Sequence, residues 1–215
     1  MEFLGLDASL KFIKSYGIPI VEYKLAKNRK EVVEFANKIG YPVVLKLDSK
    51  DIAHKTDVGG VFPNLKSNYE VEKSFLKIIS NIKSRFPNAT INGIVVQKMV
   101  EDGIEVMIGG KLDEQFGQTI TFGSGGILAE LIEDISIRVC PITKSIAEEM
   151  IRETKIYRLL QGYRGFNYDV KAVVEVLLKV SKMLEKNYGI KEIDINPLFV
   201  LRKNAFAADV RVVVD

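Results

Sequence analysis

The sequence has one cysteine, one histidine and no tryptophan in 215 residues. The single cysteine, Cys140, excludes a disulfide within the chain. A structural zinc site needs about four Cys or His ligands, so the chain cannot supply one by itself. A Cys-His dyad or a Ser-His-Asp triad would require a nucleophile signature, and none is evident in the sequence. The lone His54 is therefore left with nucleophilic or phosphate-accepting chemistry, or with no chemical role.

Charge of one sign and long apolar runs are also missing. The chain carries 31 basic and 28 acidic residues, a net charge of +3, and they are mixed along the sequence, unlike the basic patch of a nucleic-acid-binding protein. No apolar run approaches the roughly 18 residues of a membrane span, and no signal-peptide pattern opens the sequence. We therefore expect a cytoplasmic protein that binds neither nucleic acid nor membrane.

What is present is the composition of a folded globular protein, with 47% hydrophobic and 27% charged residues. Hydrophobic spacing and cap residues predict helices over Asp7–Tyr16, Arg29–Ile39, Tyr69–Phe86, Ser145–Thr154 and Val170–Asn187. Strand-like runs are Ile18–Leu25, Val43–Asp48, Gly93–Val100, Ile104–Gly110, Gln118–Phe122, Glu192–Leu201 and Ala205–Val214. No repeat or low-complexity linker interrupts them, so we expect two lobes of one α+β unit.

Two details of this pattern can be checked directly. The runs Gly93–Val100, Ile104–Gly110 and Gln118–Phe122 suggest an antiparallel meander. Ser49–Asn64 is expected to be a long polar loop, and loops of that length in compact domains are usually functional or disordered.

Lys46 lies in the run that leads into this loop. Strand alternation puts Val43, Leu45 and Leu47 on one face and Lys46 on the other. A lysine on a solvated sheet face is the ordinary interpretation. The alternative is a positive charge for a polyphosphate, which the following glycine-containing loop favours.

His54 lies inside the loop. A lone histidine is more often a packed or exposed residue than a catalyst. Asp57, three residues on, could orient the imidazole, and Gly59 and Gly60 allow the backbone to approach a phosphate closely. These neighbours favour a chemical role for His54.

Asn196 and Asp209 lie in the last two strand-like runs, which form a hairpin if they pair. A carboxylate in the apolar run around Asp209 needs a partner, because an unpaired buried charge is unfavourable. Arg211, two residues on, is one candidate. Mg²⁺ is the other, since it takes one or two protein oxygens and completes its shell with phosphate and water.

A glycine-rich segment, Phe122–Gly126, follows the third run of the expected meander. It has neither the lysine-serine ending of a P-loop nor the glycine spacing of a dinucleotide fingerprint. A tight turn and a phosphate or partner contact are both open interpretations.

Taken together, several segments resemble the ATP-grasp subunit or domain of ADP-forming (NDP-forming) acyl-CoA synthetases, relatives of succinyl-CoA synthetase. The segments are Gly40–Lys46, His54–Val61, Gln115–Gly117, Phe122–Gly126, Arg138–Pro141, Gly162–Gly165 and Glu192–Leu198. This resemblance covers essentially the whole chain. It implies one ATP-grasp domain over residues 1–215, with a smaller lobe of about 20–98, a larger lobe of about 99–215 that includes the N-terminal segment, and the nucleotide cleft between them.

The resemblance also implies roles for particular residues. His54 matches a histidine that carries phosphate, and Lys46 matches the lysine on the nucleotide phosphates. The other matches are Gly59 and Gly60 over the phosphates, Gln97, Lys98, Met99 and Val100 at the hinge whose backbone receives adenine, Glu105 near the ribose, and Asn196 and Asp209 as Mg²⁺ ligands. Lys98 departs from the acidic residue expected at its position.

The implied reaction is acyl-CoA + ADP + phosphate ⇌ carboxylate + CoA + ATP, through acyl-phosphate and phosphohistidine intermediates. The cofactors are ATP/ADP and Mg²⁺. The chain shows no CoA-binding fingerprint, so the resemblance implies a CoA-binding α subunit as partner, in an α2β2 assembly. Two other functions stay open: a stand-alone ATP-grasp carboxylate ligase, and a noncatalytic ATP-grasp regulatory module.

Overall fold

The computed structural model describes residues 2–52, 54–126, 134–162, 165 and 167–215. The chain divides into two compact units. Unit 1 comprises Met1–Glu2, Ser9–Ile20 and Asp102–Asp215, and unit 2 comprises Phe3–Ala8 and Val21–Glu101. Helix α1 (Leu6–Ser15) begins in unit 2 and continues in unit 1.

Unit 2 is a four-stranded sheet with two helices. The strands are β2 (Tyr23–Ala26), β3 (Val43–Asp48), β4 (Val61–Leu65) and β5 (Gly93–Lys98), in the order β2-β5-β3-β4. Every pairing in this sheet is antiparallel. Helices α2 (Arg29–Ile39) and α3 (Asn68–Arg85) pack against its apolar residues to form one hydrophobic core.

Both helices of unit 2 begin at capping boxes. The Asn28 side chain accepts the amide of Glu31 at 3.0 Å, and Glu31 in turn accepts the amide of Lys27 at 2.7 Å. Ser67 and Glu70 repeat this reciprocal arrangement at the start of α3. Each box satisfies two amides that the first helical turn leaves without partners, so both helix starts are fixed locally.

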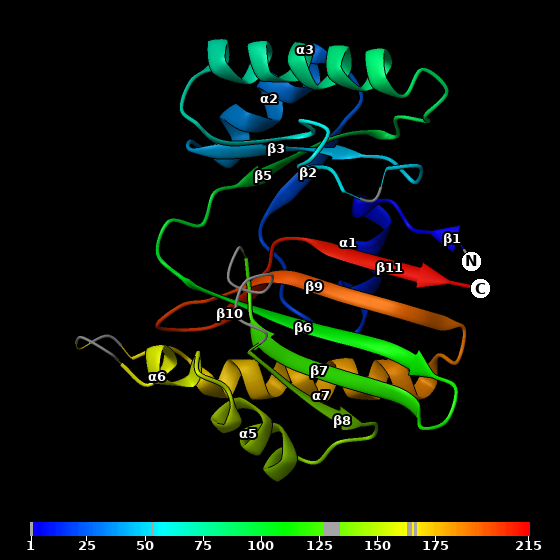
Figure 1. The fold of residues 1–215 in the computed structure, drawn as a ribbon. Coiled ribbons are helices and arrows are strands. Elements are labelled where there is room, and N and C mark those ends of the chain that lie inside the picture. The colour runs from blue at the N-terminus through cyan, green and yellow to red at the C-terminus, as the bar shows by residue number, and fades with distance from the viewer. Residues whose placement is uncertain (1, 53, 127–133, 163–164, 166) are drawn as a thin grey trace. The chain divides into compact units, whose positions relative to one another are not determined.

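Unit 1 contains a larger antiparallel sheet, in the order β1-β11-β9-β6-β7-β8, with β10 also paired to β9 (Figure 1). Its strands are β1 (Glu2–Phe3), β6 (Ile104–Asp113), β7 (Gly117–Ser124), β8 (Ile135–Val139), β9 (Ile190–Val200), β10 (Ala205–Ala207) and β11 (Val210–Val214). Its helices are α5 (Lys144–Glu153), α6 (Tyr157–Leu160) and α7 (Val170–Lys186).

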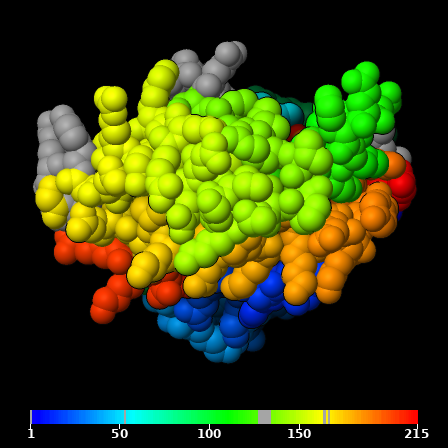
Figure 2. All heavy atoms as spheres, turned by 90° about the horizontal axis from the view of Figure 1, so that it is seen from below, coloured from blue at the N-terminus to red at the C-terminus, as the bar shows by residue number. Residues whose placement is uncertain are grey.

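Helix α7 covers one face of this sheet. A Cβ on Gly110 of β6 would lie 2.5 Å from Leu184 Cδ1 of α7, so the glycine lets helix and sheet approach closely. Helix α5 continues the cover toward β8. In Figure 2, which views unit 1 from this side, the yellow-green atoms of α5 and the segment before it form much of the visible surface.

The α+β composition is confirmed, but several expected details are wrong. The expected polar loop Ser49–Asn64 ends early, because Val61–Leu65 pairs with β3 as strand β4. The expected three-stranded meander does not form, since β5 belongs to the sheet of unit 2 while β6 and β7 belong to that of unit 1. Of the expected extended run Ile18–Leu25, only its end is strand, in β2. The segment Ile127–Ile132, which follows the glycine-rich segment, lies outside the described residues.

Strand β8 and the short helix α6 were not predicted. The expected caps lie inside their helices: Asp7 is the second residue of α1, and Asn68 is the first residue of α3, which Ser67 caps instead. No helix in the described ranges combines the length and the apolar character needed to cross a membrane.

Candidate functional site

The loop that carries His54 begins and ends on neighbouring strands. The Leu47 amide of β3 donates to the Gly60 carbonyl at 2.8 Å, and Lys46 pairs with Val61 of β4. A loop of about 6–16 residues with its ends so close is an Ω-type loop, a class that often carries function. His54 is exposed within it.

Lys46 lies at the base of this loop. Val43, Leu45 and Leu47 belong to the core of unit 2 and Lys46 does not, as strand alternation predicted. However, only 7% of Lys46 is exposed, so the interpretation of a lysine on a solvated face is wrong. Buried lysines are rare unless their charge is compensated, so Lys46 is held in a defined position at the base of the loop.

The two glycines close the loop. Gly59 has φ +67°, a left-handed conformation that favours glycine, and a Cβ on Gly60 would lie 2.9 Å from the Lys55 carbonyl oxygen. Their amides donate to Thr56 O at 3.0 Å and Lys55 O at 2.7 Å, respectively. Both N–H groups are thus used inside the turn, and contact with a phosphate through them requires the turn to open.

Asp57 was expected to orient the imidazole of His54. Both residues are exposed, and the carbonyl of Asp57 accepts a hydrogen bond from Arg85 at 3.2 Å. Within the described ranges, no hydrogen bond or ion pair joins Asp57 to His54. Orientation by Asp57 therefore stays a prediction.

The hinge segment Gln97–Val100 continues from β5. The amide of Lys98 donates to Glu22 O at 2.9 Å, and the amide of Met99 donates to Pro42 O at 3.1 Å. The backbone donors of Lys98 and Met99 are therefore already used within unit 2, and Gln97 lies in the β5 ladder between Tyr23 and Val44. Adenine recognition through the backbone would have to use the remaining groups.

Lys98, the departure from the expected acidic residue, holds the hinge to the end of α2. Its Nζ donates to the carbonyl oxygens of Gly40 at 2.9 Å and Tyr41 at 3.2 Å. A cation at a helix C-terminus also interacts favourably with the helix dipole. The lysine thus has a structural role that sequence reasoning did not find.

A buried carboxylate, Asp48, ends β3 on the Lys46 face of that strand. It is 2% exposed, and its Oδ1 has no hydrogen-bond partner in the described structure. Burial raises the pKa of Asp48, although hydrogen bonds from the backbone of Leu6 and Asp7, at the start of α1, act in the opposite direction. Sequence reasoning placed Asp48 only as a strand end.

In unit 1, the structure brings Asn196 and Asp209 together. The Asn196 amide donates to the Asp209 carbonyl oxygen at 3.1 Å, and both side chains are partly exposed. β9 pairs with both β10 and β11, so the predicted hairpin forms. Its second strand was expected to be continuous, but it is interrupted at Ala208 and Asp209, between β10 and β11. Arg211, the alternative partner of Asp209, forms an ion pair with Glu192.

Glu105 and the glycine-rich segment join the same region. Gly126 donates its amide to Asn196 Oδ1 at 3.0 Å, and Gly125 donates its amide to the Glu105 carbonyl oxygen at 2.9 Å. Gly126 has φ +60°, and a Cβ there would overlap Oε2 of Glu105. Phe122–Ser124 belongs to β7, and Gly125 and Gly126 connect the end of that strand to Glu105 and Asn196.

The residues available to a metal in unit 1 are few. No group of three or more His, Cys, Asp or Glu side chains that could hold a metal ion occurs among the residues the structure describes. Asn196 and Asp209 offer two adjacent, partly exposed oxygen ligands. That set suits Mg²⁺, which is commonly bound through one or two protein oxygens together with substrate phosphates and water.

Asp134, just before β8, binds both the end of β7 and the segment between α5 and α6. Its carboxylate accepts hydrogen bonds from the Ser124 hydroxyl at 2.7 Å and from the amides of Lys155 at 2.6 Å and Ile156 at 2.9 Å. Burial alone would raise the pKa of Asp134, but these hydrogen bonds outweigh it and the pKa lies below its usual value. From the sequence, Asp134 was expected only to mark an interruption between two segments.

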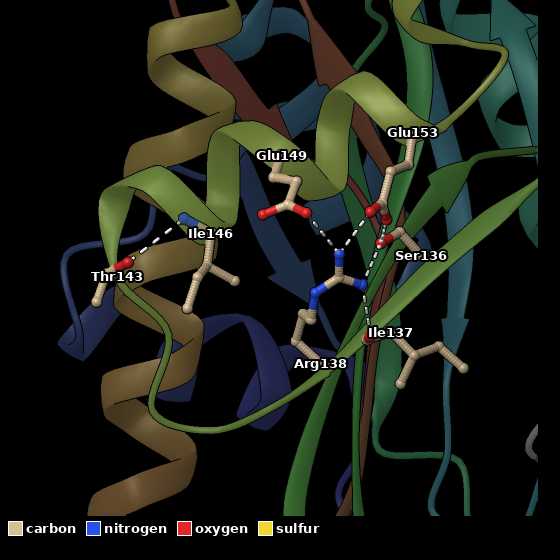
Figure 3. Close-up of polar contacts among 7 residues, drawn as sticks. All are labelled: Ser136, Ile137, Arg138, Thr143, Ile146, Glu149 and Glu153. Atoms are coloured by element: carbon tan, nitrogen blue, oxygen red, sulfur yellow. Dashed lines mark hydrogen bonds and ion pairs between the residues drawn. The ribbon is translucent and has the colours of Figure 1, made fainter.

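Arg138 joins β8 to α5 (Figure 3). Its guanidinium lies beneath Glu149 and Glu153, at 3.5 Å and 2.5 Å, and Ser136 donates its hydroxyl to Glu153 at 2.6 Å. Arg138 belongs to a segment that carried the resemblance. In this structure its ion pairs connect β8 to α5.

Residues 2–214 match the sequence profile of the ATP-grasp domain family. The chain is 42% identical to subunit beta of the ADP-forming acetate–CoA ligase I of Pyrococcus furiosus, over 95% of this chain and 88% of that protein. It is 44% identical to the ADP-forming acetate–CoA ligase I of Archaeoglobus fulgidus, over 95% of this chain but only 30% of that longer protein.

Solved structures of acetyl-coenzyme A synthetase 1 from Ca. Korarchaeum cryptofilum are also similar. One, in complex with coenzyme A, Ca-AMPCP and HgCl+, has a TM-score of 0.95 and 42% identity, covering 100% of this chain and 94% of that chain. Another, with coenzyme A and Mg-AMPPCP, has its phosphohistidine segment pointing towards the nucleotide binding site. Its TM-score is 0.83 and its identity 39%, covering 98% of this chain and 92% of that chain.

Proposed function

Because this chain belongs to the ATP-grasp family of ADP-forming acetate–CoA ligase β subunits, we propose that it moves a phosphoryl group between His54 and ADP/ATP. In this role it is the nucleotide half of a cytoplasmic acyl-CoA synthetase. A CoA-binding α subunit, in an α2β2 assembly, supplies the acyl-phosphate half. The chain spans only 30% of the Archaeoglobus relative, so the larger part of that protein lies outside the region that it matches.

The transfer conserves atoms and charge. In the direction of ATP synthesis, a phosphoryl group arrives on an imidazole nitrogen of His54. An oxygen of the ADP β-phosphate then attacks phosphorus and the P–N bond breaks. A proton already carried on the other ring nitrogen, or one taken up from solvent, lets the imidazole leave neutral. Such transfers depend mainly on positioning and on neutralising phosphate charge.

The observation that carries the proposal is the geometry of the His54 loop. The loop returns to its own base, where Leu47 bonds Gly60, and it displays His54 to solvent beyond the buried Lys46. An exposed histidine on such a loop is accessible to a phosphate carrier. Lys46 supplies positive charge for the nucleotide phosphates, and Gly59 and Gly60 allow the backbone to come close to them.

The remaining residues have supporting roles in this proposal. Asn196 and Asp209 hold Mg²⁺, which when bound neutralises charge on the nucleotide phosphates. Glu105, positioned against Gly126, orients the ribose. The hinge from Gln97 to Val100, including Lys98 and Met99, receives adenine through the backbone groups that unit 2 leaves free. Unit 2 corresponds to the smaller lobe and unit 1 to the larger.

The test uses the complex copurified from the native source. Incubation with labelled phosphate and acyl-CoA should leave acid-labile, base-stable label on this chain, and His54→Ala should abolish both the label and ATP formation. Thr56→Ala, a change in another exposed residue of the loop, is the control and should keep both. Normal ATP formation by the His54→Ala complex would show that phosphate passes directly to ADP.

The purified chain alone distinguishes the other two functions. It should bind ATP–Mg²⁺ but form no acyl-CoA from acid, CoA and ATP. Synthesis by the chain alone would indicate a stand-alone ligase. Absence of nucleotide binding would indicate a noncatalytic module.

A further inference from the structure

Strand β8 exposes three β-branched side chains on one face. Ile135, Ile137 and Val139 are 48%, 52% and 48% exposed, and their alternate positions place them together on the strand. We call these three residues the β8 strip. In the described part of unit 1, β8 is the last strand of the sheet, so its outer edge has no strand neighbour.

The polarity of β8 is the reverse of what a surface strand usually shows. Ser136 and Arg138 point to the face covered by α5, where they bond Glu153, whereas Ile137 extends away from that cluster (Figure 3). Antiparallel strands normally turn apolar side chains to the covered face and polar ones to solvent. An exposed apolar edge strand invites pairing with another chain, and proteins usually protect it with charges or a covering segment.

The β8 strip shares a sheet face with the proposed nucleotide residues. Ile137 pairs with Thr121 of β7, Thr121 with Gly109 of β6, and Gly109 with Asp194 of β9. Paired residues in adjacent strands point to the same side of a sheet. Asp194 lies two positions before Asn196, and Gly110, next to Gly109, faces α7 on the opposite side. The face opposite α7 therefore runs from β9 to the β8 edge.

We propose that the β8 strip is a docking site for the CoA-binding partner subunit, which places an apolar segment on the strip and pairs a strand with the β8 edge. The inference rests on the proposed function and adds a location for the partner. In the proposed function the phosphoryl group finally reaches ADP at Mg²⁺ held by Asn196 and Asp209, and the strip is apolar surface on the same sheet face as Asp194, two positions before Asn196. Strand addition at a free edge supplies affinity through main-chain hydrogen bonds and specificity through alternate side chains.

The size of the single-chain relatives supports this occupant. This chain corresponds to 30% of the Archaeoglobus protein. The remainder is large enough to bury a surface strip of this kind. Single exposed apolar residues are normal on a protein surface, whereas adjacent ones form a patch of the kind found at interaction sites. The three residues of the β8 strip are adjacent on one edge strand.

The test is Ile137→Lys in the full chain, reassembled with the copurified CoA-binding chain. Leu76→Lys in α3, where the leucine is 51% exposed, is the matched control. We expect the affinity for the CoA-binding chain to fall at least about tenfold for Ile137→Lys, as for a central apolar interface residue. Leu76→Lys should assemble normally, and both variants should bind ATP–Mg²⁺ as the wild type does.

Three results would overturn the proposal. They are unchanged assembly of Ile137→Lys, equal weakening by both variants, and loss only of a self-association shown by the wild-type chain. Ile137→Thr keeps β-branching and serves if the lysine variant does not fold, with weaker assembly again expected. Hydrogen exchange on the wild-type complex should show slower exchange of the Ile135–Val139 amides than in the free chain. ATP–Mg²⁺ binding and His54 labelling test the proposed function separately, so its failure is distinguishable from failure of this docking site.

Discussion

Replacing Gly126 with alanine tests whether Glu105, Gly126 and Asn196 act as one arrangement. Gly126 has φ +60° and donates its amide to Asn196 Oδ1 at 3.0 Å. A new Cβ would overlap Oε2 of Glu105. Because that oxygen is the end of a flexible side chain, we expect the Glu105 carboxylate to move away.

The size of the effect follows from two contributions. Alanine in a left-handed conformation is less stable than glycine by about 1 kcal/mol. Losing or bending the Gly126–Asn196 hydrogen bond adds about 1 kcal/mol. Gly126→Ala should therefore lower the free energy of unfolding by about 2 kcal/mol.

Gly117→Ala is the matched control. Gly117 has φ +76°, and a Cβ there would meet no atom within 4 Å, so this variant should lose only the backbone contribution of about 1 kcal/mol. Urea unfolding gives both free energies, and calorimetry gives the affinity for ATP–Mg²⁺. Only Gly126→Ala should weaken nucleotide binding, by roughly tenfold, since one hydrogen-bonded contact contributes about 1–1.5 kcal/mol.

A double-mutant cycle compares Glu105→Ala and Gly126→Ala with the double variant Glu105→Ala/Gly126→Ala. Without the Glu105 carboxylate the overlap disappears, so the two substitutions should lower nucleotide affinity by less than the sum of their separate effects. Equal stability losses for Gly126→Ala and Gly117→Ala, with unchanged nucleotide affinity in both, would refute the reasoning.

Four further predictions concern single side chains. Lys46→Met should weaken ADP and ATP more than tenfold but adenosine little, because it deletes the charge that we propose contacts the phosphates; equal losses in calorimetry would make Lys46 structural. Asp209→Asn should reduce the Mg²⁺ dependence of nucleotide binding while the melting temperature stays near that of the wild type, and an unchanged dependence would remove Asp209 from the site. Lys98→Met should lower the free energy of unfolding by about 1–2 kcal/mol, since the two carbonyls at the end of α2 lose their donor; urea curves that superimpose on the wild type would contradict this role. The raised pKa of Asp48 means that the folded state binds its proton more tightly than the unfolded state, so unfolding free energy should decline as pH rises from about 4 through that pKa. Asp48→Asn should remove this decline in urea titrations, and a parallel pH profile would contradict it.

Local signals predicted the elements whose causes lie within a few residues. The helices α2, α3 and α7 follow from apolar spacing and from caps only three residues from their partners. Strand β4 was missed because Pro63 and Asn64 interrupt its pattern, and an edge position in the sheet tolerates that proline. The expected meander failed because the chain changes sheets between Lys98 and Ile104, and sheet membership depends on distant partners.

The sequence by itself determined which chemical groups exist and how they are spaced. A single histidine in a glycine-containing loop, a lysine at the end of the preceding strand, and a final pair of strands carrying Asn196 and Asp209 were all readable. These features limit the chemistry that the chain can perform, because reactivity depends first on which side chains are present.

Only the tertiary structure decided how those groups are used. It buried Lys46, joined Lys98 to Gly40 across 58 positions and Gly126 to Asn196 across 70. It also turned the apolar face of β8 outward and its polar side chains toward α5. Hydrogen-bond partners and burial depend on which distant segments pack together, and the periodicity of a single segment carries no information about that choice.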